Sequence, residues 1–148
     1  MPHTPDDNPQ SPPGPIEVGY RFARMHRFDP RQVSAFAHAA GDDNPLHHDA
    51  GIAACSRFGG LIASATHTGS LLMGLAASHL SKDSNVVGVS FTLELLKPVF
   101  ADEEVALAWI VDKVEPHPRS GSFLELSGSV TGADGTLRLS SRGRVLVW

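Results

Sequence analysis

The sequence predicts an α+β domain in which an antiparallel sheet wraps around one long helix. After residue 85, four segments alternate apolar and polar residues and are separated by turn signals, which is typical of antiparallel strands. Before them, residues 62–80 consist mostly of Ala, Leu, Ser, Thr and Gly, which predicts a long helix that is apolar on most sides and therefore buried. One strand and two shorter helices are expected ahead of it, and this order of elements is typical of the α+β class.

Length and composition bound the class of protein. A chain of 148 residues with 41% hydrophobic and 19% charged residues is expected to be globular. It contains no run of about 18 apolar residues, so no transmembrane helix and no membrane partner are expected. The net charge of -4 argues against a nucleic-acid partner. The single cysteine, Cys55, excludes an intrachain disulfide and fits a reducing cytoplasm.

The N-terminus is expected to be a disordered leader over residues 1–16, because it is rich in Pro, Asp, Asn and Ser. It has no basic start and no apolar stretch, so it does not resemble a signal peptide. A single domain is then expected over residues 17–148. Its first strand is predicted at residues 19–28, which alternate loosely and end before Asp29-Pro30.

Helix signals follow that strand directly. Asp29 is a suitable N-cap with Pro30 at the first helical position, and Gly41 ends the helix. Asp49 is expected to cap a second, short helix over residues 50–56. The apolar face of the first helix is formed by residues at i, i+3, i+4 and i+7, namely Val33, Phe36, Ala37 and Ala40.

The strand patterns after the long helix have clear ends. Lys97-Pro98 bounds the first pattern, and Asp134-Gly135 is a strong hairpin signal before the last one. The four predicted strands cover residues 86–96, 104–114, 122–131 and 137–148.

The connection from Gly41 to Asp49 concentrates the side chains that can perform acid–base chemistry. Gly41 and Pro45 both break helices, so the segment is a sharp loop. Asp42 and His47 lie five positions apart across the proline turn and can face one water molecule. Imidazole takes up a proton near neutral pH, and a carboxylate can orient water and exchange a proton with it. On spacing alone, a capping Asp42 and an ordinary loop histidine are the commoner reading.

The other polar residues of the loop have simpler interpretations. Asn44 is either a turn residue that bonds nearby backbone, which is the commoner case, or a substrate contact. His47, His48 and Asp49 together suggest a metal, but their spacing fits no metal signature and adjacent histidines point apart. No metal and no cofactor are therefore expected.

Three segments resemble one known family. Residues 42–47 (Asp-Asp-Asn-Pro-Leu-His) resemble the Asp-x-Asn-Pro-x-His hydratase motif of the MaoC-like, (R)-specific enoyl-CoA hydratases. Residues 58–63 resemble the turn of that family into its central helix, and residues 91–99 resemble its strand that leads to a proline bend. The resemblance runs in the right order from about Glu17 to the C-terminus.

This resemblance implies a hot-dog fold, a homodimer, and acyl thioester substrates carried by CoA or by an acyl carrier. It implies hydratase or dehydratase activity with Asp42 and His47 as the catalytic residues. Two rival functions stay open. One is a hot-dog thioesterase, in which a carboxylate activates water at the carbonyl carbon. The other is a catalytically silent acyl-CoA-binding subunit.

One departure from the family pattern favours the silent subunit. Where the family commonly has His-Gly, this chain has Ser64-Ala65, which is nearer to a subgroup with Ile-Ala-Ser-Gly-Trp-His-Thr. In relatives the glycine N–H polarises the thioester carbonyl, and Ala65 keeps an N–H for this role. The start of the long helix at Ser64 and Ala65 would also stabilise an enolate-like oxygen. His67, in the first turn, is expected either to contact substrate or to be buried and hydrogen-bonded.

Overall fold

The computed structural model describes residues 16–148, so the expected leader lies, except for Ile16, outside the described residues. Every strand and helix expected from the sequence is present within a few residues of its predicted ends. No helix among the described residues is long and apolar enough to span a membrane. The elements are β1 (Arg21–Arg27), α1 (Pro30–Ala39), the 3-10 helix η1 (Pro45–His47), α2 (Ala50–Ala54), α3 (Ala65–Leu80), β2 (Val86–Leu95), β3 (Glu104–Pro116), β4 (Ser122–Gly132) and β5 (Leu137–Val147).

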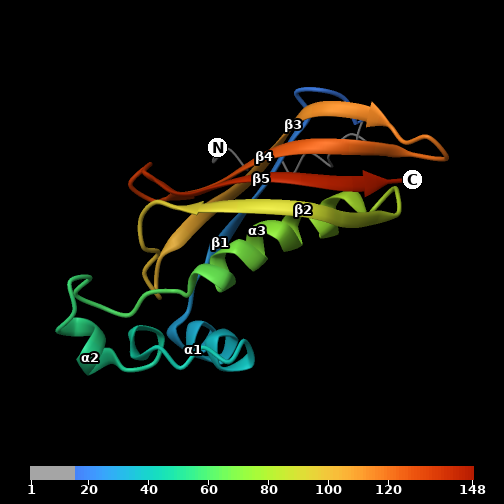
Figure 1. Ribbon diagram of the computed structural model, residues 1–148. Helices are drawn as coiled ribbons and strands as arrows, with labels where there is room; N and C mark the ends of the chain where they lie inside the picture. The colour runs from blue at the N-terminus through green and yellow to red at the C-terminus, as the bar shows by residue number, and fades with distance from the viewer. Residues whose placement is uncertain (1–15) are drawn as a thin grey trace, which may run out of the picture.

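The five strands form one antiparallel sheet in the order β1-β3-β4-β5-β2. Figure 1 shows α3 lying along one face of this sheet, which curves over it. The short helices α1 and α2 gather beyond the end of the sheet at which α3 begins. The predicted α+β class, with a sheet wrapped around one long helix, is therefore confirmed, and the loop between α1 and α2 lies near the N-terminus of α3.

The centre of the core is Trp109 on β3, which is 1% exposed. Its indole Nε1–H donates a hydrogen bond of 2.7 Å to the carbonyl of Leu72, which fixes α3 against the sheet. Gly128 on β4 makes room for the ring, because a β-carbon there would lie 2.5 Å from Cζ3 of Trp109. The indole therefore fixes the position of α3 on the sheet and requires a glycine at position 128.

The long helix differs from its prediction in two ways. It begins at Ala65 and not at residue 62, because Ile62 forms an antiparallel bridge with Phe100. It is also not buried on most sides, since Met73 is 37% exposed and only one stripe faces the sheet. The predicted burial on most sides is therefore wrong, because the sheet and α1 cover only part of the helix surface. The buried stripe consists of His67, Thr68, Gly69, Leu72, Leu75, Ala76 and Leu80.

Candidate active site

The loop between α1 and α2 is shaped by local signals that the sequence contains. Gly41 takes a positive φ of 73°, which a residue with a β-carbon rarely adopts, and so ends α1 sharply. Asn44 caps η1, and its Oδ1 accepts a hydrogen bond of 3.1 Å from the N–H of Leu46. Pro45 then supplies the first position of η1, and this turn carries His47 back toward Asp42.

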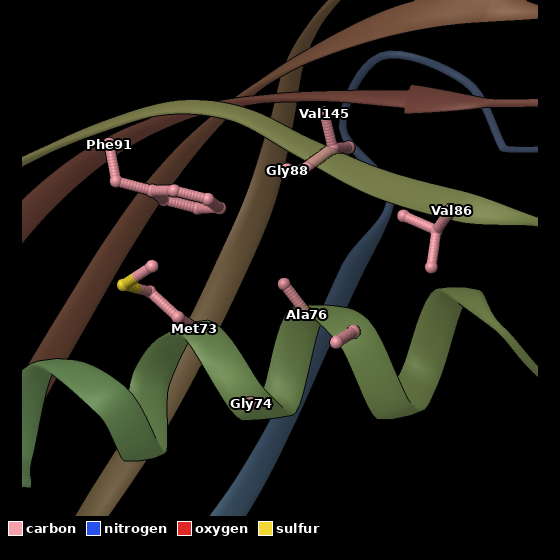
Figure 2. A pocket seen from close by; sticks show the side chains of 8 residues that line it. Met73, Gly74, Ala76, Val86, Gly88, Phe91 and Val145 are labelled. Carbon is pink, nitrogen blue, oxygen red and sulfur yellow. The ribbon is translucent and has the colours of Figure 1, made fainter.

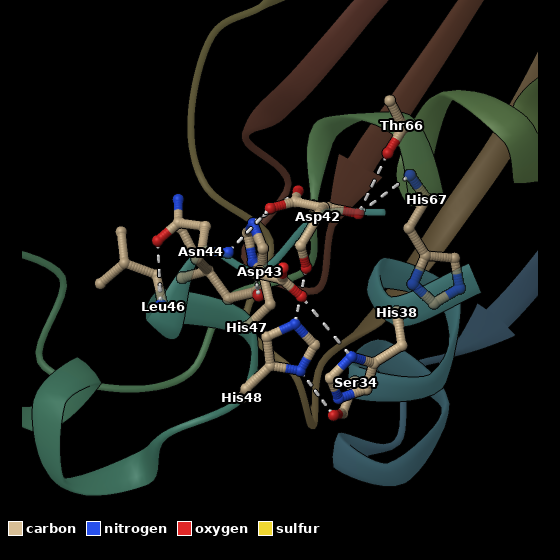
Figure 3. Close-up of polar contacts among 12 residues, drawn as sticks. Ser34, His38, Asp42, Asp43, Asn44, Leu46, His47, His48, Thr66 and His67 are labelled. Atoms are coloured by element: carbon tan, nitrogen blue, oxygen red, sulfur yellow. Dashed lines mark hydrogen bonds and ion pairs between the residues drawn. The ribbon is translucent and has the colours of Figure 1, made fainter. Parts of the chain in front are cut away.

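Asp42 and His47 face each other, with 3.3 Å between Oδ2 of the carboxylate and Nε2 of the imidazole (Figure 3). The His47 side chain is 7% exposed and that of Asp42 is 34% exposed, so the pair lies where protein meets solvent. The other ring nitrogen of His47, Nδ1, lies 2.8 Å from the carbonyl oxygen of Ile62. Because a carbonyl only accepts, Nδ1 carries the proton in the neutral ring, and the lone pair of Nε2 faces Asp42.

A cavity of about 440 Å³ opens beside this pair. Asp42 and His47 belong to its wall, and most of the remaining wall is apolar. This combination of an apolar lining with a few convergent polar groups is typical of a small-molecule site. The apolar part of the wall includes Phe58, Leu95, Leu96, Val99 and Leu139.

The N-terminus of α3 lies at the same cavity, where Ala65 forms part of the wall. Ser64 is the N-cap, and its Oγ accepts from the N–H of His67 at 3.3 Å. The N–H groups of Ala65 and Thr66 have no hydrogen-bond partner among the described residues. No non-glycine residue of the described chain has a positive φ, so the backbone at Ala65 suits a residue with a β-carbon.

His67, in the first turn of α3, is not part of the cavity wall. Its ring stacks on Phe36 of α1 with 4.4 Å between centroids and forms a T-shaped pair with Phe28 with 5.1 Å between centroids. Burial lowers the pKa of His67, and the neighbouring His26 lowers it further. Nδ1 of the ring is buried without a partner among the described residues. The predicted burial of His67 is therefore confirmed, the predicted hydrogen bond is not found at Nδ1 among these residues, and a substrate contact stays a prediction.

The structure thus brings together three of the predicted site residues, Asp42, His47 and Ala65, at one cavity. Asn44 and Ser64 lie next to them as backbone caps and are not part of the wall. Among the described residues, no group of three or more His, Cys, Asp and Glu side chains is placed to hold a metal ion.

Arg138 is a member of the cavity wall that sequence reasoning missed. Its guanidinium donates to the carbonyl of Pro98 at 2.6 Å and forms an ion pair of 2.7 Å with Glu103. Both side chains are nearly buried, at 9% and 12% exposure. An arginine in a strand pattern gives no signal of such a partner, because Arg138 and Glu103 are distant in sequence.

A second cavity, of about 290 Å³, lies between α3 and the strand β2 (Figure 2). Met73 and Phe91 face each other across it, and none of its lining residues is ionisable. The second cavity therefore has no group that could transfer a proton, and the cavity beside Asp42 is the candidate active site. The residues around the second cavity are Met73, Gly74, Ala76, Ala77, Val86, Gly88, Phe91 and Val145.

Residues 5–122 match the family model described as a MaoC like domain, and the chain belongs to this family. The predicted resemblance is confirmed. Over 91 residues the chain is 37% identical to the (R)-specific enoyl-CoA hydratase of Aeromonas caviae, and the match covers 61% of this chain and 66% of that protein.

Solved structures agree with this assignment. The (R)-hydratase from A. caviae involved in PHA biosynthesis matches with a TM-score of 0.81 at 27% identity, covering 88% of this chain and 96% of that one. The MaoC-like dehydratase from Rhodospirillum rubrum matches with a TM-score of 0.77 at 26% identity, covering 90% and 93%. The predicted hot-dog fold is therefore confirmed.

Proposed function

We propose that this protein is a hydratase or dehydratase that adds water to, or removes it from, an acyl thioester at the 2-enoyl or 3-hydroxyacyl level. The observation that carries the proposal is the pair Asp42 Oδ2 and His47 Nε2, 3.3 Å apart at the wall of an apolar cavity. Family membership and the similarity to (R)-specific enoyl-CoA hydratase support the same class of reaction.

The pair performs acid–base chemistry on one water molecule. With the proton of His47 held on Nδ1 by the carbonyl of Ile62, Nε2 is free to accept a proton from water. Asp42 orients the same water through Oδ2, while its Oδ1 accepts from the N–H of Asn44 at 3.0 Å. The water oxygen bonds to Cβ of the enoyl group as the proton passes to the pair, and a proton returns from the pair to Cα. Dehydration is the same sequence in reverse.

Charge develops on the thioester oxygen during this addition, and the start of α3 supplies donors for it. The free N–H groups of Ala65 and Thr66 stand at the positive end of the helix dipole. Donors fixed in advance at a developing oxyanion stabilise the transition state more than the ground state. Ala65 therefore takes the role that a glycine has in relatives, because this role is performed by the main-chain N–H, which alanine also has.

The apolar cavity wall, which includes Leu95, Leu96 and Leu139, suits the hydrocarbon part of an acyl group. We propose that this acyl group is carried by CoA or by acyl carrier protein. We also propose that the enzyme can remove water from a 3-hydroxyacyl thioester. The reaction proposed here uses only side chains, main-chain N–H groups and water, and requires no cofactor.

The test is to follow crotonyl-CoA and a longer 2-enoyl-CoA by the loss of enoyl absorbance, with a thiol reagent in a parallel reaction. Hydration predicts loss of absorbance without release of free CoA. Release of free CoA would replace the proposal with a thioesterase. Binding of the thioesters without turnover would replace it with a silent binding subunit.

We also propose that two copies of the chain associate through β2. This strand is at an edge of the sheet and pairs only with β5 among the described residues. Several of its apolar side chains are exposed, with Val89 at 52% and Leu95 at 60%. The unpaired N–H and C=O groups of such an edge strand readily pair with a strand of another chain. Light scattering should show a dimer of the wild type and a monomer of Val89→Lys. Met25→Lys, on the opposite edge strand β1, is the control and should stay dimeric. A monomeric wild type would refute this assembly.

We place the protein in the cytoplasm because its single cysteine is free and exposed. An exposed thiol persists in a reducing compartment and is readily oxidised outside one. Fractionation of the native host with an antibody would test this location, and recovery in a secreted fraction would contradict it.

A further inference from the structure

Asp42 is held from its main chain as well as through its side chain. Its N–H donates to the carbonyl of Ala37 at the end of α1, at 2.8 Å. Its carbonyl oxygen lies 2.7 Å from Nε2 of His48. The aspartate side chain has only two rotatable bonds, so the position of its carboxylate depends strongly on the position of its main chain. The bond to His48 therefore contributes directly to where Oδ2 meets His47.

His48 is itself fixed from α1. Its Nδ1 lies 2.7 Å from Oγ of Ser34, and the two side chains are half-buried (Figure 3). Because the carbonyl of Asp42 only accepts, Nε2 of His48 carries a proton and the neutral ring accepts the Ser34 hydroxyl at Nδ1. A protonated ring would donate from both nitrogens to the same two oxygens, since a hydroxyl can also accept. The connection therefore holds in either charge state of His48.

From this chain of hydrogen bonds we infer that Ser34 and His48 are positioning residues for Asp42, and thus determine the rate of the proposed hydration. The inference rests on the proposed function. Neither residue is part of the cavity wall, so neither is expected to contact the acyl group. Their effect is to fix the carboxylate before substrate arrives, and displacement of a catalytic group by about 1 Å costs on the order of 100-fold in rate.

The variants separate the hydrogen bonds from the bulk of the ring. His48→Leu removes both bonds at similar volume, whereas His48→Gln keeps an amide N–H that can reach the carbonyl of Asp42. Ser34→Ala removes only the distant end, and Ser34→Thr restores its hydroxyl. His38→Leu is the matched control, because this exposed imidazole stacks on His48 at 4.0 Å but is no part of the chain of hydrogen bonds.

Rates are measured with crotonyl-CoA at equal concentrations of folded protein, confirmed by circular dichroism. His48→Leu should lower kcat by about 10- to 100-fold with little change in KM, because a misplaced catalytic group acts on the chemical step. His48→Gln should recover most of that loss. Ser34→Ala should fall between wild type and His48→Leu, whereas Ser34→Thr and His38→Leu should keep the wild-type kcat.

The outcomes that oppose the inference are distinct from failure of the proposed function. An active wild type with unchanged kcat in His48→Leu would overturn the positioning role alone. Equal losses in His48→Leu and His48→Gln would also overturn it, because the donor to Asp42 would then be irrelevant. A folded wild type that does not hydrate any enoyl thioester would overturn the proposed function and this inference together.

Discussion

The ion pair between Arg138 and Glu103 predicts a large and strongly non-additive effect on stability. The two charges lie 2.7 Å apart and are 9% and 12% exposed. At an effective dielectric constant of about 20, their attraction is about 6 kcal/mol. The cost of taking both ions out of water offsets most of this energy, so the net contribution of the intact pair is small. Removal of one partner is expensive because the other charge is left buried.

Arg138→Met and Glu103→Gln should therefore each lower the free energy of unfolding by about 3–5 kcal/mol. The double variant should lose clearly less than the sum of the two, because it buries no unpaired charge. Asp134→Asn is the control, since this exposed carboxylate contacts the same guanidinium at 3.3 Å and should have the smallest effect.

The assay is urea unfolding at a fixed protein concentration, which matters because association contributes to apparent stability. The slope against urea should stay constant across the variants, so that the midpoint reports stability. Two strictly additive single losses would refute the reasoning, and so would single losses below about 1 kcal/mol, which are typical of exposed pairs.

Three further predictions concern the core and α3. Gly128→Ala should lower the free energy of unfolding by about 1–3 kcal/mol, because its β-carbon would lie 2.5 Å from the Trp109 ring; an unchanged urea midpoint would contradict this. Ser64→Ala should cost about 1 kcal/mol by removing the N-cap of α3, and Ser64→Asp, which keeps a capping oxygen, should recover it. Burial lowers the pKa of His67 from 6.5, so the unfolded chain takes up a proton there first and stability falls as the pH drops below 6.5. Unfolding followed against pH should show a weaker fall in His67→Phe, and an identical fall would show that His67 is not responsible.

The sequence predicted best those features that neighbouring residues decide. Asp29 caps α1 through its Oδ1, which accepts from the N–H of Arg31 at 2.7 Å, and Asp49 caps α2 in the same manner. Gly41 takes the positive φ expected of a terminating glycine. Asp42 and His47 meet because a proline turn of fixed geometry joins them, so local sequence alone brings the two side chains together.

Features decided by distant residues were missed. The start of α3 is delayed because Ile62 bridges Phe100, and a local apolar pattern carries no information about that partner. The direction of His67 depends on Phe36 of another helix, and both candidate directions satisfy the same helical periodicity. The order of the strands in the sheet is equally absent from the alternation that predicts each strand.

The central claim is that Asp42 and His47 together catalyse hydration, and single-residue variants test it most directly. Turnover of crotonyl-CoA is measured for wild type, Asp42→Asn and His47→Gln, with folding verified for each. Positioned acid–base groups contribute about 10²–10⁴-fold, so each variant should lose at least about 100-fold in kcat. The double variant should be little worse than either single one, because the two residues act on one water molecule. A folded Asp42→Asn or His47→Gln variant with the wild-type kcat would contradict the account.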